Sequence, residues 1–143
     1  MSIESILKAK GTRVIRTTPD ATVKSAADEM HRQGIAALLV MSRDQIIGVI
    51  SEREIVGGFA QHGEKLSSMA VEQIMRRDVY TVDPEDHVTR AMALMTQHRV
   101  RHLPVVSSGK VVGIVSIGDA VKNRLDDLEA ETRVLRDIYI AAR

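Results

Sequence analysis

Two short stretches of the sequence combine a hydroxyl group with a carboxylate at a spacing that suits ligand binding. Val111–Asp119 runs through apolar, mostly β-branched residues and one glycine to Ser116, and Asp119 follows three residues later; Ile46–Glu54 repeats this pattern. Such a run is typical of a strand that leads directly into a helix. The first turn of a helix offers free backbone N–H groups. Together with the hydroxyl and the carboxylate, they could hold an anionic or sugar-bearing ligand.

The same spacing also has a purely structural interpretation. A serine followed three residues later by an acid forms a capping box, in which the two side chains only satisfy N–H groups of the helix. Ser51 with Glu54, and Ser116 with Asp119, fit this description as well. The sequence leaves both interpretations open, although a glycine and a basic pair favour a ligand at the second stretch. These residues are Gly118, Arg101 and His102.

Other chemistries find less support in the sequence. His98 and His102 have the His-x-x-x-His spacing, but that spacing aligns two metal ligands only within a single helix. Here the first histidine ends a predicted helix and the second enters a strand, so we predict no metal site. The order Ser-His-Asp, a nucleophile elbow and a Walker-type loop are all missing, and we therefore predict that the protein is not an enzyme.

Composition and charge narrow the class of protein further. The chain has 143 residues, 44% of them apolar and 27% charged, with a net charge of +1 and no cysteine. These values are typical of a globular cytoplasmic protein and give no reason to expect a membrane as a partner. A nucleic-acid partner would require a basic stripe with aromatic stacking platforms. Since the only aromatic residues are Phe59, Tyr80 and Tyr139, nucleic-acid binding is a weak alternative.

The two stretches belong to a longer internal repeat. Each residue from Arg13 to Val56 can be set against the residue 65 positions later without a gap. Eleven of these 44 pairs are identical, and nine others exchange one apolar residue for another. The chain therefore contains two copies of one unit, and each copy alone would bury little surface. We expect the copies to pack on one another as a pseudo-twofold pair.

Hydrophobic periodicity predicts the same element order in both copies: strand, helix, strand, strand, helix. The fold class is therefore α/β (α+β), with two tandem βαββα units that each contain a small mixed three-stranded sheet. The predicted strands are Val14–Thr17, Ala37–Met41 and Ile46–Ile50 in the first copy, and Val79–Val82, Leu103–Val106 and Val111–Val115 in the second.

We predict three segments along the chain. Residues 1–65 form a short N-terminal helix and the first unit, residues 66–128 form the second unit, and residues 129–143 form a C-terminal helical extension. The last helix carries apolar residues at steps of three and four, which predicts one apolar face. This face would contact either a partner subunit or the core of its own chain. Its residues are Val121, Leu125, Leu128, Leu135 and Ile138.

The residues quoted so far resemble a tandem pair of CBS domains, the arrangement called a Bateman module. The resemblance is closest at His98–Val106 and Gly113–Asp119, while Gly48–Val56 resembles the form common in small stand-alone bacterial CBS-pair proteins. It extends from about Ile6 to Leu128 and leaves no room for a fused catalytic domain. The resemblance implies a regulatory, energy-sensing module that acts on a separate and unknown regulated protein, as a homodimer. A scaffold protein with vestigial clefts is the alternative.

The resemblance also implies an adenosyl ligand in the cleft between the copies, with no further cofactor required. Candidates are AMP, ADP, ATP, NAD(H) and S-adenosylmethionine. Asp119 would accept hydrogen bonds from the ribose hydroxyls, and Ser116 with the following N–H groups would hold a phosphate. Arg101 and His102 occupy positions where the family presents cations to phosphates. The full set for this favoured site is Gly11, Thr12, Ile35, Ala36, Ala37, Arg101, His102, Ser116, Ile117, Gly118 and Asp119.

A second, weaker site is implied at the equivalent position of the first copy. Its residues are Ser51, Arg53, Glu54, Arg77 and Val100. Glu54 departs from the family pattern because it replaces the usual aspartate. Its extra methylene moves the carboxylate by about 1.5 Å, which is enough to weaken a two-oxygen grip on a ribose.

Overall fold

The computed structural model describes residues 1–142 and divides the chain into two compact units. The first, here called the central unit, is Arg13–Tyr80. The second, the terminal unit, combines Met1–Thr12 with Thr81–Arg143. These units differ from the predicted ranges 1–65 and 66–128. The segment before the first repeat belongs to the terminal unit, and the segment before the second repeat belongs to the central unit.

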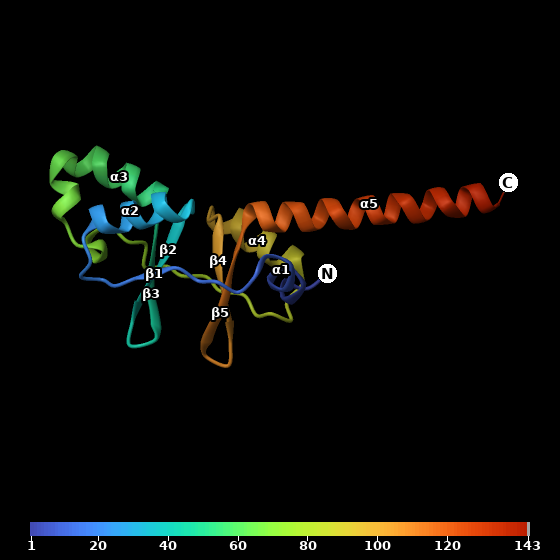
Figure 1. Ribbon diagram of the computed structural model, residues 1–143, viewed down its shortest axis with the longest axis horizontal. Helices are drawn as coiled ribbons and strands as arrows, with labels where there is room; N and C mark the ends of the chain where they lie inside the picture. Colours follow the sequence, from blue (N-terminus) through green and yellow to red (C-terminus); the bar gives the residue numbers. More distant parts are fainter. Residues whose placement is uncertain (143) are drawn as a thin grey trace. The chain divides into compact units, whose positions relative to one another are not determined.

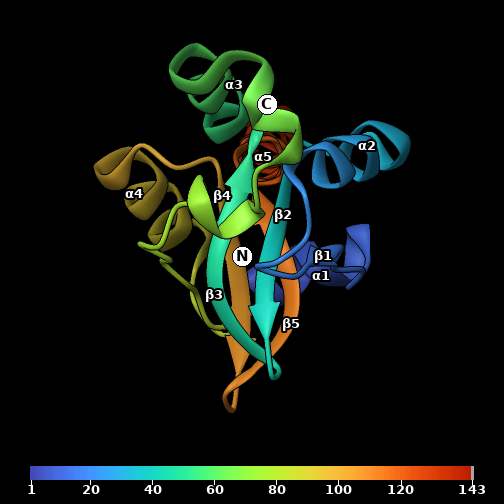
Figure 2. The ribbon, with the colours of Figure 1, turned by 90° about the vertical axis from the view of Figure 1, so that its left-hand side faces the viewer.

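The central unit has the predicted mixed sheet of three strands, in the order β1-β2-β3. Strand β2 pairs with β1 in parallel and with β3 in a hairpin, and helices α2 and α3 lie toward the end of the hairpin opposite its turn (Figures 1 and 2). The elements are β1 (Arg16–Thr17), α2 (Val23–Gln33), β2 (Ala37–Ser42), β3 (Gln45–Ser51), α3 (Glu52–His62), and the 3₁₀ helices η1 (Gly63–Ser68) and η2 (Val71–Gln73).

Helix α2 illustrates how the local sequence sets an element and its buried face. The Oγ1 of Thr22 accepts a hydrogen bond from the Ser25 N–H at 3.1 Å, which caps the start of the helix. Gly34, with φ at +65°, ends it in the left-handed conformation that glycine adopts easily. Between these ends, Ala26 and Met30 pack into a core with residues of β2, β3 and the segment after α3. The buried core residues are Ala26, Met30, Leu38, Val40, Ile50, Val71 and Met75.

The terminal unit repeats this plan with a smaller sheet. Its elements are α1 (Ile3–Lys10), α4 (Val88–His98), β4 (His102–Ser107), β5 (Lys110–Ser116) and α5 (Ile117–Ala141). We expected three strands here, but the structure has the β4–β5 hairpin and, in place of the strand predicted at Val79–Val82, one parallel bridge between Val82 and Val105.

Pro104 gives a physical reason for the shorter ladder. In the central unit, the equivalent residue, Leu39, donates its N–H to the Ile15 carbonyl at 3.3 Å. Proline has no N–H, so this bond cannot form at Pro104. Two bonds of Val82 remain: its N–H donates to the Pro104 carbonyl at 3.1 Å, and its carbonyl accepts from the Val106 N–H at 2.9 Å. The proline thus removes one rung of the ladder.

The N-terminal helix α1 packs on the second repeat, within the terminal unit. The three apolar residues Ile3, Ile6 and Leu7 share one face of α1 and are all buried. The Ile3 N–H donates to the Asp86 carbonyl at 2.9 Å, which ties the start of α1 to the turn before α4. Leu7 lies so close to Gly113 of β5 that a Cβ atom there would come within 2.6 Å of its Cδ2.

The first repeat is completed in an equivalent way by the segment that precedes the second repeat. The Val23 N–H donates to the Met69 carbonyl at 2.9 Å. Met75 packs against Gly48, where a Cβ atom would lie 2.6 Å from its sulfur. Gly48 and Gly113 occupy the same position in the repeat, so this glycine serves the packing of an adjoining segment in both copies.

Helix α5 is a single element of 25 residues and confirms the helix predicted beyond the second repeat. Its start packs on its own unit through the buried Ala120, and its C-terminal part extends past the β4–β5 hairpin (Figure 1). The predicted apolar stripe is exposed along the whole helix, so it does not pack on the core of the terminal unit. Among residues 1–142, no helix combines the length and the apolar character that crossing a membrane would require.

Candidate functional site

The junction between β5 and α5 has the geometry of a capping box. Ser116 is the N-cap of α5, and its Oγ accepts a hydrogen bond from the Asp119 N–H at 3.2 Å. In return, the Ser116 N–H donates to Asp119 Oδ2 at 2.9 Å. The structural interpretation of the motif is therefore correct for this junction. It does not exclude a ligand, because a capping carboxylate has further lone pairs.

Lys10 is the residue at this junction that the sequence did not predict. Its Nζ donates to Asp119 Oδ2 at 2.6 Å and to the Ile114 carbonyl at 2.9 Å. Both side chains are partly exposed, at 32% for Lys10 and 24% for Asp119. The ion pair joins residues 109 positions apart, so no local pattern could reveal it. The one available signal was that Lys10 immediately precedes Gly11 and Thr12, which the family resemblance had placed at the site.

The surroundings of Asp119 lower the pKa of its carboxyl group. Partial burial by itself would raise the pKa of this carboxyl. The hydrogen bond from Lys10, the bonds from Ser116 and the positive charge of Lys10 outweigh burial and hold the pKa below its ordinary value of 3.8. The carboxylate is therefore ionised at neutral pH and presents a negative charge at the start of α5.

The basic pair predicted near the phosphates lies beside this junction. His102 is the first residue of β4 and pairs with Ser116 in the β4–β5 ladder. Arg101 precedes it with an exposed side chain, and its carbonyl accepts a hydrogen bond from the Ile117 N–H at 2.8 Å. The structure thus brings five predicted residues of the favoured site together on one end of the terminal unit. These are Arg101, His102, Ser116, Ile117 and Asp119.

Gly118 lies in the first turn of α5 and is exposed. The nearest atom to a Cβ built there is Ser116 Oγ, at an ordinary contact distance of 3.7 Å. Neither the backbone nor the packing therefore requires glycine at this position. What the missing side chain leaves is access to the backbone at the start of the helix.

Gly11 and Thr12 also belong to the terminal unit, although they lie before the first repeat. Gly11 ends α1 with φ at +99°, and its N–H donates to the Leu7 carbonyl at 2.8 Å. Both residues are exposed. Since Lys10 bonds to Asp119, the adjoining Gly11 is held near the β5–α5 junction.

The equivalent junction of the central unit, between β3 and α3, is also a closed pair. Glu54 Oε1 accepts from the Ser51 N–H at 3.0 Å and from the Ser51 hydroxyl at 2.7 Å. The longer glutamate side chain thus bonds to both groups of its own cap. The Ala36 carbonyl accepts a hydrogen bond from the Glu52 N–H at 3.1 Å, which is equivalent to the bond from the Ile117 N–H to the Arg101 carbonyl. Ala37 is the ladder partner of Ser51.

The remaining predicted residues are distributed over the two units. Ile35 is half-buried before β2, and Arg53 is exposed in the first turn of α3. Arg77 donates to the Glu72 carbonyl at 3.1 Å and has an exposed side chain. Val100 is buried between α4 and β4 in the terminal unit. Each predicted site therefore combines residues of the central and the terminal unit.

The β5–α5 junction can bind hydroxyl and anionic groups but has no nucleophile with an attached base. A carboxylate accepts hydrogen bonds from sugar hydroxyls, and an ammonium group binds phosphate oxygens. Among residues 1–142, no group of three or more histidine, cysteine or acidic side chains is placed to hold a metal ion. Recognition of hydroxyl and anionic groups is the chemistry that these residues support.

Comparison with known proteins identifies the repeat. The family model described as CBS domain matches residues 10–60 and 71–126. Among curated proteins, the chain is 35% identical over 130 residues to the CBS domain-containing protein CBSX3, mitochondrial, of Arabidopsis thaliana. That match covers 85% of this chain and 63% of the relative, so the chain spans less than two thirds of the relative's length.

Solved structures with the same fold include proteins of similar size. A protein with CBS domains from Burkholderia ambifaria is 38% identical, with a TM-score of 0.85, over 89% of this chain and 96% of that one. A CBS domain protein from Pyrobaculum aerophilum was solved in complex with AMP. It is 26% identical, with a TM-score of 0.73, over 83% of this chain and 89% of that one.

Proposed function

The chain belongs to the CBS-domain family, with two copies of the domain, and from this premise we propose that it is a regulatory module that binds an adenosyl nucleotide. The observation that carries the proposal is the ionised Asp119 in the first turn of α5, next to Ser116 and the cation of Lys10. The AMP complex of the relative from Pyrobaculum aerophilum supports the choice of ligand class. The module has no catalytic activity in this proposal and acts on a separate protein.

The favoured site is built around the β5–α5 junction. Asp119 accepts hydrogen bonds from the ribose hydroxyls, which take the place of Lys10 at Oδ2. The displaced ammonium group, now 2.6 Å from Oδ2, then turns toward the phosphates, where it joins Arg101 and His102. The base contacts small and apolar residues. These are Gly11, Thr12, Ile35, Ala36 and Ala37.

The charges at the site favour one class of adenosyl ligand over another. Lys10, Arg101 and His102 supply cationic or hydrogen-bonding groups, and phosphates complement such groups. S-adenosylmethionine carries a positively charged sulfonium and no phosphate, so it gains less from them. We therefore expect AMP, ADP, ATP or NADH to bind more tightly than S-adenosylmethionine.

The equivalent site at Ser51 and Glu54 is the weaker member of the pair. Glu54 already accepts two hydrogen bonds from Ser51, and breaking them would oppose binding of a sugar hydroxyl. Binding of one ligand per chain follows from this difference.

Calorimetric titration of matched variants tests the proposal. Asp119→Ala and Glu54→Ala remove the acid of a capping box at equivalent positions, so both cost the chain a helix cap. Only Asp119→Ala should also weaken nucleotide binding, by about 10- to 150-fold for each charge-assisted hydrogen bond that is lost. The titration series is AMP, ATP, NADH and S-adenosylmethionine. No binding of any of them, or an equal loss in both variants, would contradict the proposal.

A scaffold protein with vestigial clefts is the second candidate. The observation in its favour is that the serine and the acid are hydrogen-bonded to one another at both junctions, so neither requires a ligand. This candidate predicts that nucleotides leave the melting temperature unchanged, whereas the regulatory module is stabilised by its ligand by mass action.

We also propose that two copies of the chain associate. In the regulatory module, the ligand changes the relative stability of two arrangements of the repeats, and the separate regulated protein binds one arrangement more tightly than the other. A change in the affinity of that protein on addition of nucleotide is the corresponding observation.

A further inference from the structure

The apolar stripe of α5 remains exposed along a helix that continues well beyond the family match at residue 126. Leu125 is 55% exposed, Leu128 42% and Leu135 66%. Exposure of this stripe to water is unfavourable, since burial of one leucine side chain contributes about 1.5–3 kcal/mol of free energy. A stripe of this length on a helix is typical of a docking surface.

The spacing along the stripe is that of a two-stranded coiled coil. Steps of four and three residues lead from Val121 through Leu125, Leu128, Thr132 and Leu135 to Tyr139, a repeat of seven residues over nearly three heptads. This series adds Thr132 to the stripe and ends on Tyr139 in place of Ile138. Thr132 is the one residue between Leu128 and Leu135 in this series that carries a polar group, its hydroxyl. Its Oγ1 donates to the Leu128 carbonyl at 2.9 Å, so the polar group is satisfied within the helix and the methyl group is left for contact.

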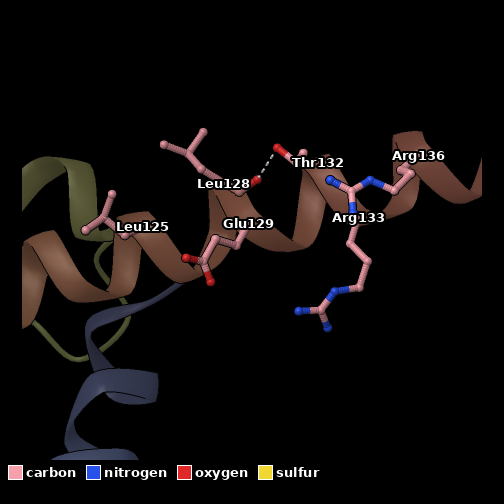
Figure 3. A pocket seen from close by; sticks show the side chains of 6 residues that line it. All are labelled: Leu125, Leu128, Glu129, Thr132, Arg133 and Arg136. Atoms are coloured by element: carbon pink, nitrogen blue, oxygen red, sulfur yellow. Dashed lines mark hydrogen bonds between the residues drawn. The ribbon is translucent and has the colours of Figure 1, made fainter.

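A shallow pocket on the surface of α5 supports the view that another element covers this helix. It is lined by six residues, all of them from α5 (Figure 3). Leu125, Leu128 and Thr132 of the seven-residue repeat line it, together with the longer side chains of Glu129, Arg133 and Arg136. A depression lined by a single helix becomes a packed surface only when another element covers it.

The charges that flank the stripe indicate which element that is. In a parallel pair of identical helices, a residue at position g faces the residue five positions later on the second helix. This places Glu131 opposite Arg136 of the second copy, and Arg124 opposite Glu129 of the second copy. Both pairs have opposite charge. In the antiparallel arrangement that overlaps the whole stripe, Glu131 would instead face Glu131 of the second copy.

We propose that α5 of one chain pairs in parallel with α5 of a second copy, through the seam Val121, Leu125, Leu128, Thr132, Leu135 and Tyr139. The assignment rests on the proposed association of two copies and adds the surface and the direction. It is independent of nucleotide binding. Because both helices then run side by side from the β5–α5 junctions, the two junctions lie at the same end of the coiled coil.

Light scattering with size-exclusion chromatography of full-length variants tests the surface. Leu135→Glu places a charge in the seam, while Val134→Glu makes a similar change at a neighbouring residue that is 56% exposed and outside it. We expect Leu135→Glu to weaken the dimer by at least about 100-fold, since two leucines lose their burial, and Val134→Glu to leave it unchanged. Circular dichroism checks that both variants fold. A monomeric wild type overturns the association itself; a dimer that Leu135→Glu does not weaken overturns only the α5 surface.

Disulfide trapping tests the direction, because the chain has no cysteine of its own. Val121→Cys and Leu135→Cys, made separately, lie about 21 Å apart along the helix. In a parallel pair each cysteine meets its own equivalent, so both variants form covalent dimers under mild oxidation. No antiparallel register brings both into reach, since disulfide-linked Cα atoms lie only about 4.4–6.8 Å apart. Covalent dimers from one variant alone, or equally from the control Val134→Cys, would overturn the parallel arrangement.

A charge exchange provides an independent check. Arg136→Glu puts two acids opposite one another on each side of the seam and should raise the dimer dissociation constant. Adding Glu131→Arg restores opposite charges and should return the constant toward the wild-type value. Residues 131 and 136 are not neighbours on one helix, so this rescue cannot come from within a single chain. A double variant that is as weak as Arg136→Glu overturns the pairing.

Discussion

At the scale of single residues, the acid of the second junction has two roles that involve different partners. Ser116 and Asp119 satisfy each other as a helix cap, and Lys10 neutralises the remaining charge from a distant part of the chain. The cap is a local feature, while the ion pair exists only because α1 packs beside β5. A ligand that replaces Lys10 therefore gains access to an acid that is already ordered.

Removal of the ion pair should change the titration of Asp119. In the Lys10→Met variant, the hydrogen bond and the charge of Lys10 are lost, while burial and the bonds from Ser116 remain, so the pKa of Asp119 should rise. Carboxyl carbon shifts measured by NMR as a function of pH would report the change. Lys8→Met is the control, because Lys8 pairs with Glu4 on the exposed face of the same helix. Equal pKa values of Asp119 in the wild type and Lys10→Met would contradict the assignment.

The lowered pKa also predicts the pH range in which Asp119 stabilises the fold. A carboxyl whose pKa is lower in the folded than in the unfolded chain contributes stability above the unfolded value of 3.8. This contribution is lost as the pH falls through the lower, folded-state pKa. The difference in free energy of unfolding between the wild type and Asp119→Asn should therefore be constant near neutrality and shrink below pH 3.8.

Substitution of Gly118 should have opposite effects on the stability of the fold and on nucleotide affinity. Gly118→Ala places a methyl group in open space within a helix, where alanine is preferred to glycine, so stability should rise by up to about 1 kcal/mol. If a nucleotide approaches the backbone here, the same variant should bind it more weakly. Gly57→Ala, which also adds a methyl in open space on a helix, should raise stability without changing affinity. Unchanged nucleotide affinity in Gly118→Ala would argue against a close approach at this turn.

At the scale of elements, the repeated glycine of the third strand has a packing role. Gly48 and Gly113 receive side chains of the segments that complete each repeat, Met75 and Leu7. The sequence pattern placed these glycines beside the functional junctions, and the structure shows that their immediate neighbours are apolar side chains. The element that fills each gap comes from outside the repeat.

Substitution at the two glycines should therefore have unequal costs. In Gly48→Ala, the new Cβ lies 2.9 Å from the Arg76 carbonyl oxygen and 2.6 Å from the Met75 sulfur, and the backbone atom cannot move cheaply. A loss of about 1–3 kcal/mol in the free energy of unfolding is expected. Gly113→Ala meets only the end of the Leu7 side chain, which can rotate, so its cost should be smaller. Denaturant unfolding gives both values, and a larger loss for Gly113→Ala would contradict this account.

At the scale of the whole molecule, the chain crosses over between its repeats. The segment before the first repeat completes the terminal unit, and the segment before the second repeat completes the central unit. Residues 1–12 thus depend on residues 81 onward for their burial, although they are the most distant parts of the sequence.

Deletion of residues 1–10 tests this dependence. The deletion exposes the face of β5 around Gly113 and removes the bonds of Ile3 and Lys10 to the terminal unit. Amide hydrogen exchange should become faster in β4 and β5, with β2 and β3 of the central unit less affected. Faster exchange in β2 and β3 than in β4 and β5 would show that α1 supports the first repeat instead.

The sequence by itself determined the repeat, the strand–helix junctions and the long last helix, because each depends on periodicity or on caps within a few residues. It also placed Ser116 and Asp119 together, since three residues of helix bring them within bonding distance. Tertiary structure alone decided the rest. Lys10 reaches Asp119, and Leu7 reaches Gly113, across more than a hundred residues, and no local spacing encodes such contacts. The missing strand of the second sheet follows from Pro104, whose effect depends on which strand lies beside it.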